Sequence, residues 1–220
     1  MTRIKICGMT RVADAVAAVD AGADAIGLIF WARSPRTVDE QQARAIVSVL
    51  PPFVSVVGVF VDETRDNVRV IADFVGLTAV QLHGREEPED WIGFPRAVVK
   101  AMPLASYERN PWRATDAGIL VDAHDPVTIG GTGRTIDWQQ AATIASERHL
   151  VLAGGLRPEN VGDAVRVVAP WAVDVASGVE SVPGIKDHAR MRAFIAAVRE
   201  ADAVRQRSAS ASHTEQESAQ

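Results

Sequence analysis

Cys7 has the most distinctive chemistry in this sequence, because it is the only cysteine among 220 residues. A thiol acts as a base or nucleophile only as the thiolate, which a nearby positive charge or a helix N-terminus stabilises. Lys5 lies two residues earlier, on the same face of an extended segment, and could supply that charge or form a salt bridge. A lone cysteine is commonly just a small buried apolar residue. The following Gly8, which marks a turn, favours the functional interpretation.

Asp122 is the first candidate for an acid, because it directly follows the apolar segment 118–121. A carboxylate that closes an apolar segment costs free energy unless it has a partner or faces a cleft. Asp125 and Asp174 compete for the same role. For each of these aspartates, capping or hydrogen bonding within a loop is the alternative.

Glycines recur after the later apolar segments. Gly154 and Gly155 follow one of them, and Ser177 and Gly178 follow the next. Glycine lets the backbone approach a ligand closely, and N–H groups at the start of a helix attract anions. These glycines therefore indicate an anion site, although tight connections between elements would also need them. Gly131 and Gly133, within the segment 130–133, predict a loop whose backbone closes over the ligand.

Three further polar residues are candidates for binding. Arg36 could hold a carboxylate through two parallel hydrogen bonds, with Arg33 as its rival and a solvated surface position as the alternative. Gln81 lies near the end of the fourth apolar segment, and His83 follows that segment. The role of His83, as a ligand contact or as a structural residue, stays open.

These candidates fall at or after the ends of eight short apolar segments, which are rich in β-branched residues. Most are apolar throughout, as in strands that are buried on both faces of a parallel sheet. The predicted strands are residues 4–7, 25–30, 54–60, 79–82, 97–102, 119–122, 150–153 and 172–176.

Helical sequence separates these strands, with apolar residues at positions i, i+3, i+4 and i+7. Thr37 and Glu40 have the spacing of a capping box, Gly22 is placed to end the first helix, and Pro158 suits a first helical turn. The predicted buried faces are Val12, Ala15, Val16 and Val19; Val68, Ile71, Ala72 and Val75; Val161, Ala164, Val165 and Val168; and Met191, Phe194, Ile195 and Val198.

Eight strands, each followed by helix-like sequence, predict an α/β fold of one domain: a (β/α)₈ TIM barrel over residues 1–204. A doubly wound open sheet is the alternative. The fifth unit is the weakest, because residues 106–116 contain Pro111 and polar residues. Residues 205–220 are polar, without periodicity, and predict a disordered tail. Active sites of this barrel lie at the C-terminal ends of the strands, where all the candidates fall.

Composition narrows the class of protein. The chain has 23 basic and 28 acidic residues, so it offers no sign of a nucleic-acid surface. One cysteine permits no internal disulfide and no site of several thiolates, which suits a reducing cytoplasm. We expect no secretory signal and no membrane span.

Across residues 3–200 the sequence resembles the phosphoribosylanthranilate isomerase family. Several ordered motifs at fitting spacings are more specific than any one of them. They are segments 5–10, 34–36 and 81–84, Asp122 with 130–133 and 137–138, and segments 153–156 and 174–180. Two positions depart from the family: Ala176 stands where a second serine is usual, and Ile136 where an aromatic residue is usual.

The resemblance implies an Amadori rearrangement of N-(5-phosphoribosyl)anthranilate, with Asp122 as acid, Cys7 as base, and neither metal nor cofactor. Arg36 would hold the anthranilate carboxylate, and the loops after strands seven and eight would hold the phosphate. The partner is thus a small phosphorylated aminosugar, for a monomer or homodimer. The expected substrate-binding residues are Arg36, Gln81, Gly131, Gly133, Gly154, Gly155, Asp174, Ser177 and Gly178.

Two other functions remain open. A histidine-pathway or dual-substrate aminosugar isomerase would share the phosphate loops, but those relatives carry an aspartate where Cys7 stands. A non-catalytic phosphate-binding or flavin-binding α/β protein would need no paired acid and base. A colourless protein with isomerase turnover would exclude the second of these.

Overall fold

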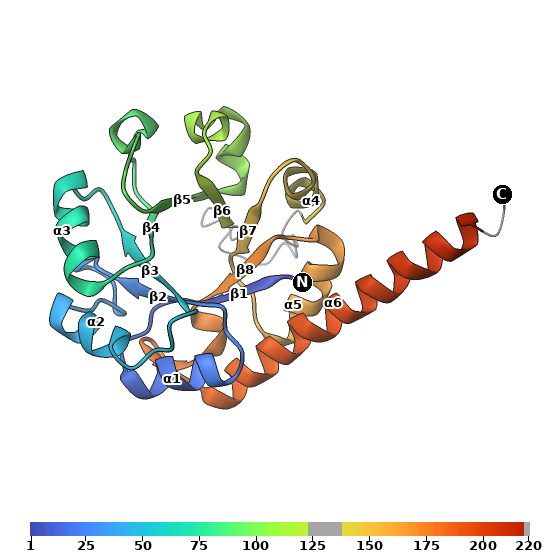
Figure 1. Cartoon of the computed structure of the whole chain (residues 1–220), viewed down its shortest axis with the longest axis horizontal. Helices are drawn as coiled ribbons and strands as arrows, with labels where there is room; N and C mark the ends of the chain where they lie inside the picture. The colour runs from blue at the N-terminus through green and yellow to red at the C-terminus, as the bar shows by residue number, and fades with distance from the viewer. Residues whose placement is uncertain (123–137, 218–220) are drawn as a thin grey trace, which may run out of the picture.

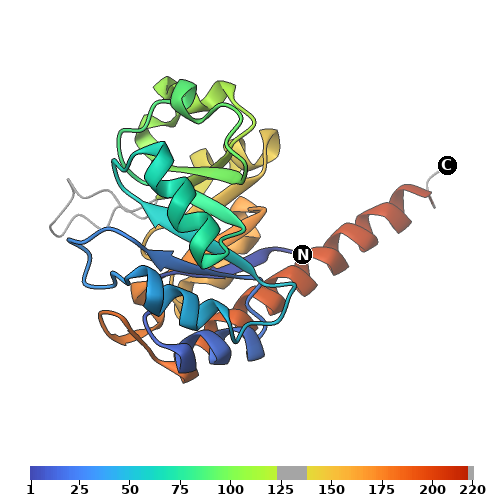
Figure 2. The same ribbon diagram turned by 60° about the vertical axis from the view of Figure 1, so that its left-hand side comes forward.

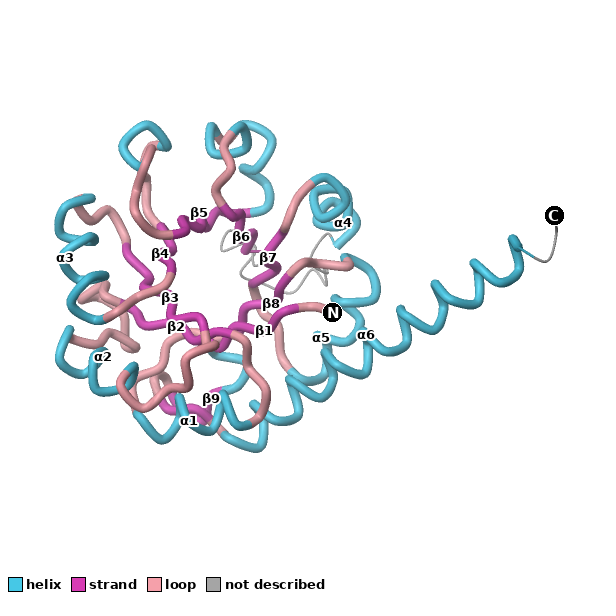
Figure 3. Tube along the Cα trace, viewed as in Figure 1, coloured by secondary structure: helices cyan, strands magenta, loops and turns pink. Residues whose placement is uncertain are grey.

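Eight parallel strands pair in chain order and close into a barrel, as the ring of strands in Figure 3 shows. The computed structural model describes residues 1–122 and 138–217. Closure comes from pairing of the first strand with the eighth, with Lys5 opposite Asp174, and it excludes an open sheet. The strands are β1 Arg3–Ile6, β2 Ala25–Ile29, β3 Ser55–Phe60, β4 Ala79–Leu82, β5 Ala97–Pro103, β6 Gly118–Asp122, β7 Leu150–Ala153 and β8 Ala172–Val175.

The described helices cover the outside of this ring (Figure 1). Their buried faces are confirmed for three helices, with Val68, Val161 and Met191 as the first residue of each face. A smaller apolar cluster fills the barrel interior: Ala101, Leu120, Val151, Ala153 and Ala172. The helices are α1 Val12–Asp20, α2 Glu40–Val47, α3 Arg65–Val75, α4 Trp138–Glu147, α5 Pro158–Val168 and α6 His188–Glu217.

The face predicted for α1 is confirmed at Ala15 and partly at Val19, but it is wrong at Val12. Its buried residues are Asp14, Ala15 and Ala18, while Val12 is exposed. Asp14 turns inward because its carboxylate accepts hydrogen bonds from the backbone N–H of Lys186 and from the ring of His188. Both donors lie more than 170 residues away, so periodicity within α1 could not reveal them.

The predicted helix ends are partly confirmed. Gly22 has φ of 102° just beyond α1, and Pro158 is the first residue of α5. The capping box of Thr37 and Glu40 is wrong, because Asp39 caps α2 by accepting from the N–H of Gln42. Thr37 instead forms an isolated parallel bridge with Ile29, which keeps it extended.

The fourth and fifth units have no α-helix on their outer side. The fifth was predicted to be irregular, and it contains only the short 3₁₀ helices η2 Leu104–Arg109 and η3 Pro111–Ala114. The fourth was predicted to be helical and is not, since only η1 Pro88–Trp91 follows β4. Gly93 and Pro95 account for this, because each disfavours continuation of the helix that begins at Pro88.

A short excursion follows β8 before the last helix. It consists of η4 Ser177–Val179 and an antiparallel hairpin of β9 Glu180–Val182 and β10 Ile185–Lys186. The sequence did not predict this hairpin, which lies beside α1 (Figure 3).

The two ends of the barrel domain are fastened to each other. The Asp202 carboxylate in α6 accepts from the backbone N–H and the hydroxyl of Thr2, at 2.6 and 2.8 Å. Beyond this contact α6 continues away from the barrel, as Figures 1 and 2 both show. Residues 205–217 are therefore helical rather than irregular, since elongating an existing helix needs no new nucleus. The domain boundary at residue 204 stays a prediction.

Candidate active site

A cavity of about 330 Å³ opens at the C-terminal ends of the strands. All the predicted site residues that the structure describes line it; Gly131 and Gly133 lie outside the described residues. A larger cavity, about 900 Å³, lies beside η1 and η3 and contains none of them, so size alone does not identify the site. The predicted residues at the smaller cavity are Cys7, Arg36, Gln81, Asp122, Gly154, Gly155, Asp174, Ser177 and Gly178.

Cys7 lies where β1 ends, with 6% of its surface exposed. Its backbone N–H donates to the Val175 carbonyl at 2.8 Å, so the ladder with β8 fixes the residue that carries the thiol. Gly27 on β2 leaves space for the sulfur, because a Cβ there would lie 2.6 Å from Sγ. The sequence analysis did not single out Gly27. A glycine within an apolar strand often marks a close approach of another backbone, and this was the signal that the sequence offered.

The charges around Cys7 are mixed. Burial raises the pKa of the Cys7 thiol, while the cations of Lys5 and Lys186 oppose that shift and Asp174 adds to it. Lys5 has both roles that the sequence left open: its Nζ lies 2.9 Å from Asp174 Oδ1, and its positive charge acts to lower the pKa of Cys7. Burial disfavours the Lys5 cation, but Asp174 and Cys7 together raise its pKa, so it remains charged.

Arg36 is tied to a residue that sequence reasoning did not single out. Its Nε and Nη2 donate to the two carboxylate oxygens of Glu180 at 2.8 and 2.7 Å. A guanidinium has five N–H donors, so three remain for a ligand. Gly8, in the turn that follows Cys7, contacts the same arginine. A side chain at this position would clash with it, because a Cβ on Gly8 would lie 2.6 Å from Arg36 Cδ. Arg33, the rival candidate, is exposed and does not line the cavity.

Asp122 enters the cavity from β6, which β7 and β8 separate from β1. It is half-buried, and its charge acts on His83. The surrounding protein lowers the pKa of His83, and Asp122 opposes that shift. Gln81 Nε2 lies 3.4 Å from His83 Nδ1, and both residues line the cavity.

The loops after β7 and β8 have backbone that favours glycine. Gly154 and Gly155 have φ of 90° and 62°, and a Cβ at Gly178 would lie 1.9 Å from the Leu156 carbonyl oxygen. The two loops are therefore packed against each other through glycine. Such an arrangement lets several backbone groups approach one small anion.

The comparisons with known proteins agree with this geometry. The family model for N-(5'-phosphoribosyl)anthranilate (PRA) isomerase matches residues 4–197. The chain belongs to this family. A PRA isomerase from Pseudomonas fluorescens is 50% identical over 202 residues, covering 90% of this chain and 98% of the relative. The chain is thus an isomerase of tryptophan biosynthesis that acts on phosphoribosylanthranilate.

Solved PRA isomerases share the barrel. One from Thermotoga maritima has a TM-score of 0.83 and 44% identity, covering 91% of this chain and 100% of that one. Another, in complex with reduced 1-(o-carboxyphenylamino)-1-deoxyribulose 5-phosphate, has a TM-score of 0.81 and 41% identity at the same coverage. A third contains monomers of the dimeric T. maritima enzyme, with a TM-score of 0.80, 39% identity and the same coverage. In the part of this chain that is described, no helix has the length and apolar character to cross a bilayer.

Proposed function

We propose that Asp122 and Cys7 carry the two proton transfers of this isomerisation. The observation that supports the assignment is that a thiol and a carboxyl group line one cavity from different strands. Arg36 and the glycine loops border the same cavity. Asp174, the competing acid among the described residues, lines the same cavity but is paired with Lys5 at 2.9 Å.

The first transfer opens the sugar. Asp122, as the acid, protonates the ring oxygen of the furanose, and the C1–O bond breaks as the nitrogen lone pair forms an iminium ion. The second transfer removes the proton at C2, which the neighbouring iminium makes acidic, and Cys7 as thiolate accepts it. The enolamine that results tautomerises to the ketone. Each positioned proton transfer contributes about 10²–10⁴ in rate.

The substrate's two anionic groups fit the two ends of the cavity. The ligand of the related structure carries a carboxyphenyl group and a 5-phosphate. Arg36, with three donors left over from Glu180, would hold the carboxylate. Gly154, Gly155, Ser177 and Gly178 would hold the phosphate through backbone N–H groups, with the Ser177 hydroxyl compensating for Ala176. Gln81 and Asp174 would border the ribose.

Replacement of each reacting group tests the roles. Cys7→Ala and Asp122→Ala should each lower kcat by at least 100-fold, while far-ultraviolet circular dichroism stays unchanged. Turnover is measured by the loss of the anthranilate adduct's fluorescence. Asp116→Ala is the control, because Asp116 is exposed and precedes β6 at the other end of the barrel. Near-normal turnover in either site variant would remove that residue from the mechanism.

Assembly and location complete the proposal. The chain would act in the cytoplasm as a monomer or homodimer, and the dimeric relative favours the homodimer. Light scattering after size-exclusion chromatography distinguishes the two masses. The same purified protein, given the histidine-pathway aminosugar, would reveal a second activity as turnover of that substrate.

A further inference from the structure

Lys186 is a buried cation that the proposed chemistry does not use. It lies on β10, and its side chain has 0% exposure. Its Nζ donates to the carbonyl oxygens of Cys7 and Ala176, at 2.6 and 3.1 Å, and to Glu180 Oε1 at 2.9 Å. An ammonium group has three N–H donors, so all three have an acceptor and the charge is fixed in place.

The Glu180 carboxylate connects this cation to Arg36. Oε1 accepts from Lys186, from Arg36 Nε and from the backbone N–H of Gly184, while Oε2 accepts from Arg36 Nη2. The carboxylate is 4% exposed. One buried anion thus holds two cations, of which one contacts the Cys7 backbone and the other lines the cavity beside the thiol.

We propose that Lys186 is a positioning residue for the isomerisation: it fixes the Cys7 backbone and its charge favours the thiolate, while Glu180 fixes the orientation of Arg36. This inference rests on the proposed roles of Cys7 and Arg36. The hairpin of β9 and β10 would then serve to bring Lys186 and Glu180 beneath the site.

The other charged groups around Cys7 do not replace Lys186. Lys5 on β1 is paired with Asp174 on β8, and these two charges act on the thiol in opposite directions. Arg36, from the loop after β2, shares Glu180 with Lys186. Removal of the Lys186 charge therefore leaves burial and Asp174 to disfavour the thiolate, against the cations of Lys5 and Arg36.

The single cysteine of the chain makes a direct test possible, because iodoacetamide then reports on Cys7 alone. The alkylation rate is measured against pH for the natural chain and for Lys186→Gln, which keeps two N–H donors and loses the charge. We expect the midpoint to rise by about one pH unit, so that alkylation slows about tenfold at a fixed pH below it. An unchanged midpoint in the folded variant overturns the role of the charge.

Lys100→Gln is the matched control, because Lys100 is also a buried lysine paired with a glutamate, yet it lies on β5. It should leave the Cys7 midpoint unchanged. An equal rise in both variants would indicate a general loosening of the barrel and would also overturn the proposal. Lys186→Met, in which the side chain is apolar, is the second variant for the same alkylation measurement if Lys186→Gln does not fold.

Glu180→Gln, with Lys186 in place, tests the second part of the proposal, that Glu180 fixes the orientation of Arg36. It should raise KM about tenfold with a smaller change in kcat, since Arg36 loses its fixed orientation. A lower kcat at constant KM would contradict this role of Glu180. Failure of the proposed function is distinguishable: the alkylation midpoint would rise in Lys186→Gln while the acidic limb of the kcat profile stayed where it was. That result would keep Lys186 beside the thiol and remove Cys7 as the base.

Discussion

The described residues include two buried lysine–glutamate pairs, Lys186–Glu180 on the hairpin of β9 and β10, and Lys100–Glu86 on β5 and the loop after β4. Figure 3 shows β9 and β5 on opposite sides of the ring of strands. Their Nζ to oxygen distances are 2.9 and 2.5 Å, and all four side chains are at most 4% exposed. In charge and burial the pairs are nearly equivalent. Their remaining hydrogen-bond partners differ.

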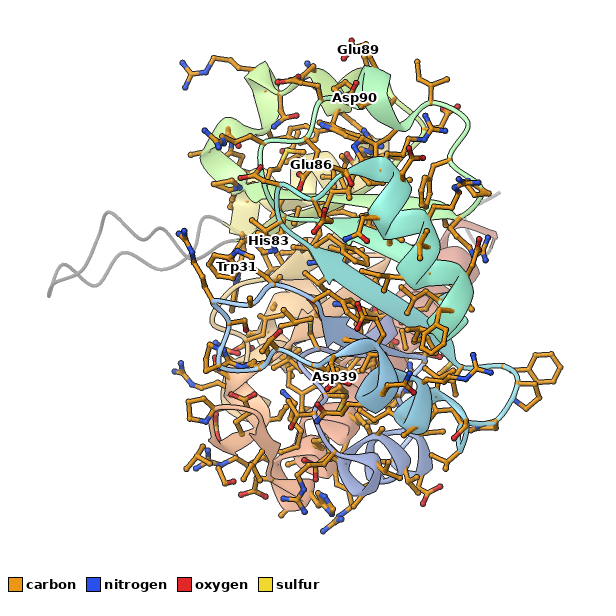
Figure 4. All side chains as sticks on the ribbon, turned by 90° about the vertical axis from the view of Figure 1, so that its left-hand side faces the viewer. Trp31, Asp39, His83, Glu86, Glu89 and Asp90 are labelled. Carbon is orange, nitrogen blue, oxygen red and sulfur yellow. The ribbon has the colours of Figure 1, made fainter. Side chains whose placement is uncertain are left out.

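Lys100–Glu86 is bonded to loop backbone. Glu86 accepts from the N–H groups of Asp62 and Gly84, and Lys100 donates to the Gly84 carbonyl. The Glu86 carbonyl also accepts from Trp112 Nε1 in η3. Figure 4 shows Glu86 and His83 along the loop that follows β4. This pair joins the loops of the units that lack α-helices, whereas Lys186–Glu180 contacts Cys7 and Arg36. The two ion pairs are equally buried, so burial does not distinguish their roles. The groups to which each pair is hydrogen bonded indicate its role.

The largest effect is expected on stability when the Lys100–Glu86 pair is broken. Lys100→Met leaves the Glu86 carboxylate buried without its cation, which costs about 3–5 kcal/mol of unfolding free energy. Urea unfolding followed by tryptophan fluorescence measures this. The kcat of the folded fraction should stay within a few-fold of the natural chain. A large loss of kcat with unchanged stability would reverse the roles given to the two pairs.

The double variant Lys100→Met with Glu86→Gln sharpens this result. Its amide oxygen still accepts from the backbone N–H groups but has no charge to leave unpaired. Part of the lost stability should therefore return. No recovery would mean that the loss came from packing.

The next effect is on binding. Arg36→Lys keeps the charge but cannot serve Glu180 and a substrate carboxylate with one planar group. KM should rise about tenfold, which corresponds to about 1.4 kcal/mol. Arg33→Lys, an exposed change in the same loop, is the control and should leave KM unchanged. Equal values in both variants would place the carboxylate elsewhere.

The pH profile gives an effect of defined sign. Burial raises the pKa of Cys7, and the active form of a base is the deprotonated one. The kcat/KM value should therefore increase with pH, with its acidic limb above the ordinary thiol value of about 8.5. In Lys100→Met the limb should not move. A limb at or below the ordinary value would mean that the thiolate is stabilised more strongly than burial opposes it.

The smallest effect is expected away from both pairs. Asp39, labelled at the start of α2 in Figure 4, accepts from the Gln42 N–H at an exposed helix end. Asp39→Ala should lower the unfolding free energy by about 1 kcal/mol. Asp39→Ser, which can also cap, should recover most of it. A loss as large as that of Lys100→Met would show that the cap does more than end a helix.

Much of the fold could be predicted because its signals are local. Each of the eight barrel strands lies within one residue of its predicted bounds, since fully buried parallel strands are continuous apolar runs. The barrel then brings the ends of those strands together, which is why Cys7, Asp122 and Gly154 share a cavity that no local pattern describes.

The errors at α1 and at Arg36 have a common origin in long-range partners. Asp14 faces inward for Lys186 and His188, and Arg36 is held by Glu180, which is 144 residues away. No periodicity encodes such pairs. Lys186 was missed for the same reason: a lysine in a short hairpin is ordinarily solvated, and only the fold places it under Cys7.

The hydrogen bonds between Thr2 and Asp202 determine when the barrel can be completed during synthesis. β1 leaves the ribosome long before its partner β8, which begins at Ala172, and before Asp202, which binds Thr2 at its start. Until then β1 has an open edge on that side. A nascent chain therefore closes and fastens its barrel only after β8 and Asp202 have left the ribosome. Truncation before residue 202 should yield a chain that aggregates, whereas loss of the residues after it should not.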